Sequence, residues 1–255
     1  MILQVSSGLE FAKKFDWRER EHEDVDMVIA NNPPSIMALR NCGLLKFFEV
    51  PGMRAQPGLL EHLICMCDVD GRFFRVGTHI LTLEIDDIYF LTGISRRGSH
   101  VNLVGKRSNR VTIESLLVTH CRASARLSGG KITIVDVTDF SLREILYTIT
   151  RAVGSASCHV ASKAHMLYAI ECTAPRVFNW CDEVLRNMSQ QLTKCKQGQL
   201  RDFVYGSILV SFFLEWVPAF RLQDIEVGIH GRREPRMRRW VDIMARQSQG
   251  CNHSC

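Results

Sequence analysis

Proline is scarce in this sequence, at 7 of 255 residues, and no stretch is dominated by a few residue types. These absences exclude a collagen-like, mucin-like or proline-rich linker protein. Long apolar runs are also missing, because the longest, Phe203 to Val217, contains three polar residues and is shorter than the roughly 20 residues that cross a membrane. We expect this run to form a buried core helix, and we expect no membrane partner.

The N-terminus lacks the basic lead and the apolar region of roughly 7 to 15 residues that are typical of a secretory signal. The 10 cysteines lie mostly inside apolar stretches of a long chain. This placement is typical of reduced core thiols and not of the disulfide scaffold of a small secreted domain. We therefore expect an intracellular protein.

The remaining composition is that of a globular chain, with 46% hydrophobic and 23% charged residues. Apolar residues recur at helical spacing in segments that are separated by Pro or Gly. The turn signal Asp70-Gly71 precedes two short β-prone runs, which predicts a hairpin. The predicted fold class is mainly α, a compact multi-helix domain with one small β-hairpin near residues 72–82. The predicted helices span about residues 35–48, 57–67, 83–92, 112–121, 142–152, 156–171, 176–193, 199–216 and 235–247.

Consecutive prolines at Pro33 and Pro34 mark the first strong break in the chain. We divide the sequence into a charged lead-in (1–34), a helical domain (35–230) and an Arg-rich C-terminal helix and tail (231–255). Residues 1–30 carry a net charge of −3 and residues 228–255 a net charge of +4. The middle supplies another +4, which we interpret as thinly spread.

Cap residues predict where two of the helices begin. Thr82 is the expected N-cap of the helix over 83–92, and Gly93 is the expected left-handed residue that ends it. Ser141 and Glu144 have the spacing of a capping box for the helix over 142–152. Residues 131–137 predict a short strand or an extended approach to that helix. In the apolar helix over 199–216 we expect five buried side chains, those of Phe203, Ile208, Phe212, Phe213 and Trp216.

Catalytic motifs are absent from the sequence. The Gly-Lys pair at Gly130-Lys131 lacks the earlier Gly and the following Ser or Thr of a phosphate-binding loop, so we interpret it as a turn. No Gly-x-Ser-x-Gly elbow and no His-Glu-x-x-His helix occurs. The sequence therefore favours a non-enzymatic protein without a cofactor.

The Cys and His residues also lack the spacing of metal ligands. Cys65 and Cys67 fall in a predicted helix, where residues two apart point away from each other. Cys158, His165 and Cys172 share a helix face, but a spacing of seven residues separates ligands by about 10.5 Å, which predicts a packed seam. The segment Cys251 to Cys255 is rich in ligands but has no second pair nearby. We expect no metal.

Three segments together resemble a known family: Phe74 to Ile94, Phe178 to Leu185, and Ser207 to Phe220. They are similar to the plant mobile domain family, whose members are also called aminotransferase-like or meristem-maintenance-like proteins. The resemblance covers roughly residues 35–220. In the first and most specific segment, an extended stretch leads into a helix that ends in a Leu-Thr-Gly-Ile sequence. The motif positions are Thr82, Leu83, Asp86, Ile88, Leu91 and Gly93.

This resemblance implies a nuclear plant protein of transposon-linked ancestry, which binds nuclear proteins and acts in the silencing of mobile elements and in genome maintenance. Cys67-Asp68 stands where the family often has Arg-Trp, which implies a divergent branch. The aminotransferase-like label implies no activity here, because neither a Schiff-base Lys nor a phosphate-binding loop for pyridoxal phosphate is recognisable.

Two other functions stay open. The first is a hydrolase or transferase whose site is assembled across the fold from residues such as Cys121 or His120. The second is nucleic-acid binding by the Arg-rich C-terminal segment, in which an amphipathic helix is anchored to the body by Trp240. The residues of that possible contact with nucleic acid or a partner are Arg232, Arg233, Arg236, Arg238, Arg239 and Trp240.

Overall fold

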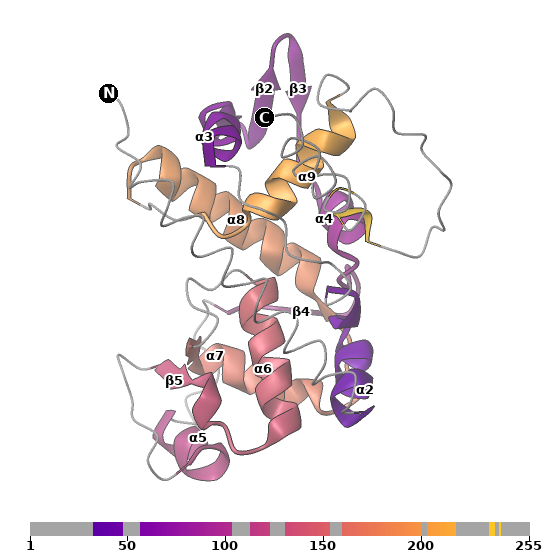
Figure 1. Cartoon of the computed structure of the whole chain (residues 1–255), viewed down its shortest axis with the longest axis vertical. Helices are drawn as coiled ribbons and strands as arrows, with labels where there is room; N and C mark the ends of the chain where they lie inside the picture. The colour runs from indigo at the N-terminus through magenta and orange to yellow at the C-terminus, as the bar shows by residue number, and fades with distance from the viewer. Residues whose placement is uncertain are drawn as a thin grey trace, which may run out of the picture. The chain divides into compact units, whose positions relative to one another are not determined.

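The computed structural model describes residues 33–47, 57–103, 113–122, 131–153, 160–199, 203–217, 235–237 and 240 (Figure 1). These residues form two compact units. Those of unit 1 lie within Lys46–Gly93 and Leu185–Cys255, and those of unit 2 within Asp26–Leu45 and Ile94–Val184. The predicted lead-in (1–34) and C-terminal region (231–255) lie largely outside the described residues.

Helices dominate the described residues, which confirms the mainly α prediction. Eight α-helices occur there, together with two short 3₁₀ helices, η1 (Leu45–Phe47) and η2 (Ile134–Asp136). The α-helices are α2 (Pro33–Cys42), α3 (Pro57–Cys65), α4 (Ile85–Thr92), α5 (Ile113–His120), α6 (Phe140–Ala152), α7 (Lys163–Cys172), α8 (Trp180–Lys196) and α9 (Gly206–Trp216).

The predicted hairpin is present, but it belongs to a larger set of short strands. Strands β2 (Phe73–Val76) and β3 (His79–Leu81) pair in antiparallel fashion, and β1 (Cys67–Asp68) adds to β2. Unit 2 holds a parallel pair, β4 (Ser99–His100) with β7 (Phe178–Asn179), and an antiparallel pair, β5 (Lys131–Thr133) with β6 (Val160–Ser162). The strand alternative predicted over 131–137 is confirmed at β5, whereas the other strands outside the hairpin were not predicted, because segments of two or three residues are too short to show alternation.

The core of unit 1 forms around α9, which packs against α3 and α4. Phe213 meets Phe74 of the hairpin edge to face, with ring centroids 5.1 Å apart. Four of the five side chains that were predicted to be buried are buried: Phe203, Ile208, Phe212 and Phe213. The prediction is wrong for Trp216, which is 51% exposed because the last residue of α9 extends beyond this core.

The core of unit 2 forms where α6 packs against α2 and α7. Tyr168, Phe178 and Trp180 form a cluster of buried rings beside these helices, with centroids 5.4 to 5.9 Å apart. The Trp180 indole Nε1–H donates to the Cys42 carbonyl at 2.8 Å. The cluster thus joins the end of α2 to the beginning of α8.

Two predicted helix starts were wrong and one predicted helix end is confirmed. Glu84 is the N-cap of α4 in place of Thr82, and its backbone N–H donates to the Asp87 carboxylate at 2.9 Å. Asp139 caps α6 in place of Ser141, by accepting from the Leu142 N–H at 2.7 Å. In both helices the actual cap is an acidic residue two positions away from the predicted cap. Gly93 ends α4 with φ 71°, as predicted.

No helix among the described residues is long and apolar enough to cross a membrane. The cysteines described there, which are Cys42, Cys65, Cys67, Cys121, Cys172, Cys181 and Cys195, are all free thiols. Cys65 ends α3 and Cys67 begins β1, so the predicted helix over 57–67 is too long at its end.

Replacing Phe212 with Ala tests the core of unit 1. Phe212 is 1% exposed and its ring lies 6.2 Å from that of Phe74. We expect Phe212→Ala to lower the free energy of unfolding by about 3 to 5 kcal/mol, since it removes a buried ring and leaves a cavity. Urea denaturation measures this change. Ile80→Ala is the control, because Ile80 is 60% exposed and should matter little; equal effects of the two would contradict this core.

Replacing Glu144 with Gln tests a buried carboxyl in α6. Burial raises its pKa above the ordinary 4.5, against the weaker opposing effect of Arg143. Its Oε2 has no hydrogen-bond partner among the described residues. Because the folded state holds the proton more tightly, stability falls as the pH rises from 4.5 through the higher folded-state pKa.

We expect Glu144→Gln to raise the unfolding free energy by roughly 1 to 3 kcal/mol at pH 7, because the amide carries no charge to bury. Thermal melts between pH 4 and 8 measure the difference, which should disappear at the acidic end. The exposed residue Glu61 provides the control variant, Glu61→Gln. If the melting temperature of Glu144→Gln does not exceed that of the wild type at pH 7, burial of the ionised Glu144 carboxylate does not destabilise the fold.

Candidate functional site

The family-motif residues lie on and around α4 in unit 1. Ile88 and Leu91 are buried, and Leu83 is 9% exposed. Thr82 and Asp86 are exposed, while Gly93 allows the left-handed turn in which its N–H donates to the Tyr89 carbonyl at 2.8 Å. The apolar motif positions therefore face the core, and α4 presents its polar side outwards.

Trp216 at the end of α9 reaches across to this helix. Its Nε1–H donates to Asp87 Oδ1 at 3.1 Å, although the side chain is 51% exposed. The indole is therefore held in one orientation while much of its surface stays in water. Tryptophan is enriched at protein interfaces, where its ring offers an apolar body and a polar N–H.

Arg236 of the C-terminal segment lies on the same side of α4. Its guanidinium carbon is 4.9 Å from the Phe90 ring centroid, which is a cation–π contact. Its Nη1 lies 3.8 Å from Glu215 Oε2. Phe90 remains 43% exposed. We call Asp87, Phe90, Trp216 and Arg236 the α4–α9 surface.

The C-terminal segment is held in place by two buried side chains. Met237 and Trp240 are each 3% exposed. The Trp240 Nε1–H donates to Glu215 Oε1 at 2.9 Å. The prediction that Trp240 anchors this segment is therefore confirmed, and its buried ring has no open face on which a base could stack. The remaining predicted contact residues, Arg232, Arg233, Arg238 and Arg239, lie outside the described residues.

The residues of the enzyme alternative are poorly arranged for catalysis. Cys121 is 9% exposed, and burial together with Asp136 raises its pKa, so the reactive thiolate is disfavoured. His120 directly precedes it, and the His120 carbonyl accepts from the Thr138 N–H at 2.9 Å. The structure assigns these two residues to the join between α5 and η2.

A histidine–carboxylate pair that the sequence reasoning missed occurs in unit 2. His100 Nδ1 lies 3.0 Å from Asp182 Oδ2. The two residues meet because the parallel pairing of β4 and β7 places His100 opposite Asn179, near the start of α8. The His100 side chain is 63% exposed, so this pair lacks the water-excluding surroundings in which such groups work as catalysts.

Metal-ligating groups do not gather in the described part of the chain, where no three His, Cys, Asp or Glu side chains could share an ion. Burial lowers the pKa of His165 to about 4, and its ring bonds to Ser162 in the capping box of α7. Cys172 is buried on the same helix. The predicted packed seam fits these two residues, whereas Cys158 and the tail Cys251 to Cys255 lie outside the described residues.

No family model matches this chain, and no curated protein and no solved structure is significantly similar to it.

A pair of Trp→Phe variants tests how the C-terminal segment is anchored. Trp240→Phe removes the donor to the mostly buried Glu215 carboxylate, so we expect a loss of about 1 to 3 kcal/mol in unfolding free energy. Trp216→Phe removes an equivalent bond at the surface and should cost less than about 1 kcal/mol. Urea titration of both variants measures the difference. A larger loss for Trp216→Phe would contradict the anchoring role of Trp240.

Proposed function

We propose that this protein is a non-enzymatic interaction module of the nucleus that binds a partner protein through the α4–α9 surface. The observation that carries the proposal is the exposed indole of Trp216, which Asp87 holds in place. Trp and Arg are the side chains that contribute most to binding energy at protein interfaces, and this surface presents one of each.

Fixing the indole before binding makes the surface more effective. A side chain that is already in one orientation loses little conformational entropy when a partner covers it. Trp216 is held by its bond to Asp87, and Arg236 is held between the Phe90 ring and Glu215. Trp216 and Phe90 are 51% and 43% exposed, so an apolar group of the partner can contact both rings.

Charge indicates the chemistry of the partner. Exposed Glu84 and Asp86 precede Asp87 at the start of α4, so this end of the surface is acidic. A basic segment that also carries an apolar side chain would complement it, with the apolar group against Trp216 and Phe90. The resemblance to the plant mobile domain family supports a nuclear partner and a role in silencing mobile elements and in genome maintenance.

Trp216→Ala and Phe90→Ala test this proposal. We expect the recovered amount of a shared set of partner proteins to fall at least about tenfold in each variant, because each variant removes an aromatic anchor. Tagged full-length chains expressed in plant cells are recovered from nuclei, and co-purifying proteins are quantified by mass spectrometry. Ile80→Ala is the matched control, since it removes an exposed apolar side chain of the same unit outside this surface.

Two results would contradict the proposal. One is a tagged chain that stays in the cytosol. The other is a set of partners that Trp216→Ala and Phe90→Ala retain as fully as Ile80→Ala does.

A further inference from the structure

One long stretch of the sequence is almost free of acidic residues. Residues 88–135 contain eight basic side chains and a single acidic one, Glu114, a net charge of +7. This exceeds the +5 of the whole chain, so the positive charge of the middle is concentrated and not thinly spread. The basic residues are Arg96, Arg97, Lys106, Arg107, Arg110, Arg122, Arg126 and Lys131.

In unit 2, the part of this stretch that follows Gly93 lies against the end of α2. The Ser95 N–H donates to the Gly43 carbonyl at 2.9 Å, and the Gly43 N–H donates to the Arg40 carbonyl at 3.2 Å. Arg40 and Arg97 are both exposed. Two arginines that are far apart in the sequence therefore belong to adjoining pieces of backbone.

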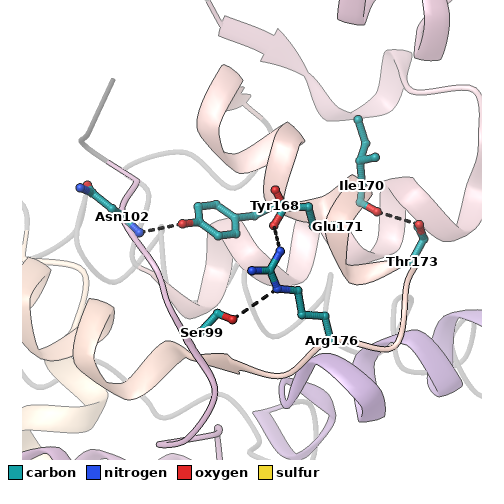
Figure 2. Close-up of polar contacts among 7 residues, drawn as sticks. All are labelled: Ser99, Asn102, Tyr168, Ile170, Glu171, Thr173 and Arg176. Carbon is teal, nitrogen blue, oxygen red and sulfur yellow. Dashed lines mark hydrogen bonds and ion pairs between the residues drawn. The ribbon is translucent and has the colours of Figure 1, made fainter. Parts of the chain in front are cut away.

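Arg176 joins the same surface from the segment before β7. The Ser99 N–H donates to the Val177 carbonyl at 2.9 Å. The Arg176 Nε–H donates to Ser99 Oγ at 3.3 Å, as Figure 2 shows. The guanidinium carbon lies 5.4 Å from the centroid of the Phe178 ring, and the side chain is 52% exposed. We call Arg40, Arg97 and Arg176 the basic surface of unit 2.

Buried groups hold the backbone of this surface. Gly98 has φ 106°, and a Cβ atom there would overlap the Val177 carbonyl, so only glycine fits between Arg97 and Ser99. The buried Tyr168 hydroxyl accepts from the Asn102 N–H at 2.9 Å, as Figure 2 shows. Arg97 therefore lies on a segment whose backbone is held in place.

The nearby carboxylates of Glu171 and Asp182 form ion pairs with residues other than Arg40 and Arg97. Glu171 lies 3.4 Å from Arg176, and Asp182 lies 3.0 Å from His100. Among the described residues, Arg40 and Arg97 form no ion pair. Their charges are therefore not neutralised within the described part of unit 2.

We propose that the basic surface of unit 2 binds the phosphate backbone of nucleic acid. Planar guanidinium groups match phosphate oxygens in pairs, and an excess of positive charge over a long stretch favours a polyanion. This activity is independent of the α4–α9 surface, and it places the nucleic-acid contact in unit 2 instead of in the Arg-rich C-terminal segment.

The double variant Arg40→Gln/Arg97→Gln tests the proposal in the full chain. Its affinity is measured by fluorescence anisotropy with mixed-sequence 20-nucleotide duplex DNA, single-stranded DNA and single-stranded RNA, between 50 and 300 mM salt. We expect affinity near 0.1 M salt to fall by about tenfold to a hundredfold, and the salt slope for duplex DNA to decrease by about two phosphate contacts. Loss on all three probes indicates backbone binding, and the probe that is bound best identifies the type of nucleic acid.

The matched control is Arg238→Gln/Arg239→Gln, which removes the same charge from the C-terminal segment. An equal or larger loss of affinity in this control would overturn the proposal, as would a wild-type chain that binds none of the probes at 50 mM salt. Poly-L-glutamate that competes as well as DNA at equal charge would also overturn it, because the surface would then not select phosphate. If thermal melting shows that the double variant is unfolded, Arg97→Gln alone should lower the slope by about one contact.

Discussion

The arrangement of unit 2 depends on the hydrogen bond between the Trp180 indole and the Cys42 carbonyl. The last carbonyls of a helix have no partner within it, so a buried helix end needs a donor from elsewhere. Trp180 begins α8, is fully buried, and supplies this donor at 2.8 Å to the final residue of α2. The same ring packs against Tyr168 and Phe178, so one side chain satisfies the polar end of α2 and fills the core beside it.

Two hydrogen bonds connect this buried cluster and its neighbour Cys181 to a segment at the surface. The Tyr168 hydroxyl accepts from the Asn102 N–H, and Cys181, which follows Trp180, donates its N–H to the Ser95 carbonyl at 3.1 Å. Both bonds hold the segment that carries Arg97, and Figure 2 shows the bond between Tyr168 and Asn102. A surface for a flexible polyanion benefits from such support, because arginines on a fixed backbone lose less entropy when they meet phosphates.

The helices were predictable because apolar spacing and Pro or Gly boundaries are local signals. The helix starts were harder to predict: Thr82 is a preferred type of cap residue and Glu84 is not, yet Glu84 is the N-cap of α4. The strands β4 and β7 depend on pairing between distant segments, which no local pattern contains. Trp216 shows the same limit in the candidate site: an apolar helix predicts burial on all sides, but the last residue of α9 is 51% exposed.

Glu215 and Trp216 show why the candidate site had to come from the structure. These neighbours in the sequence point to different partners: Glu215 accepts from Trp240, whereas Trp216 donates to Asp87. The charges of the Arg-rich segment lie close together in the sequence, yet Arg236 packs on Phe90 and Trp240 is buried. Arg40 and Arg97 carry the same charge but stand far apart in the sequence, and only the contact between Ser95 and Gly43 brings their backbones together. Consecutive charges identify a segment, whereas a binding surface is defined by which charges the fold brings together and leaves without a partner.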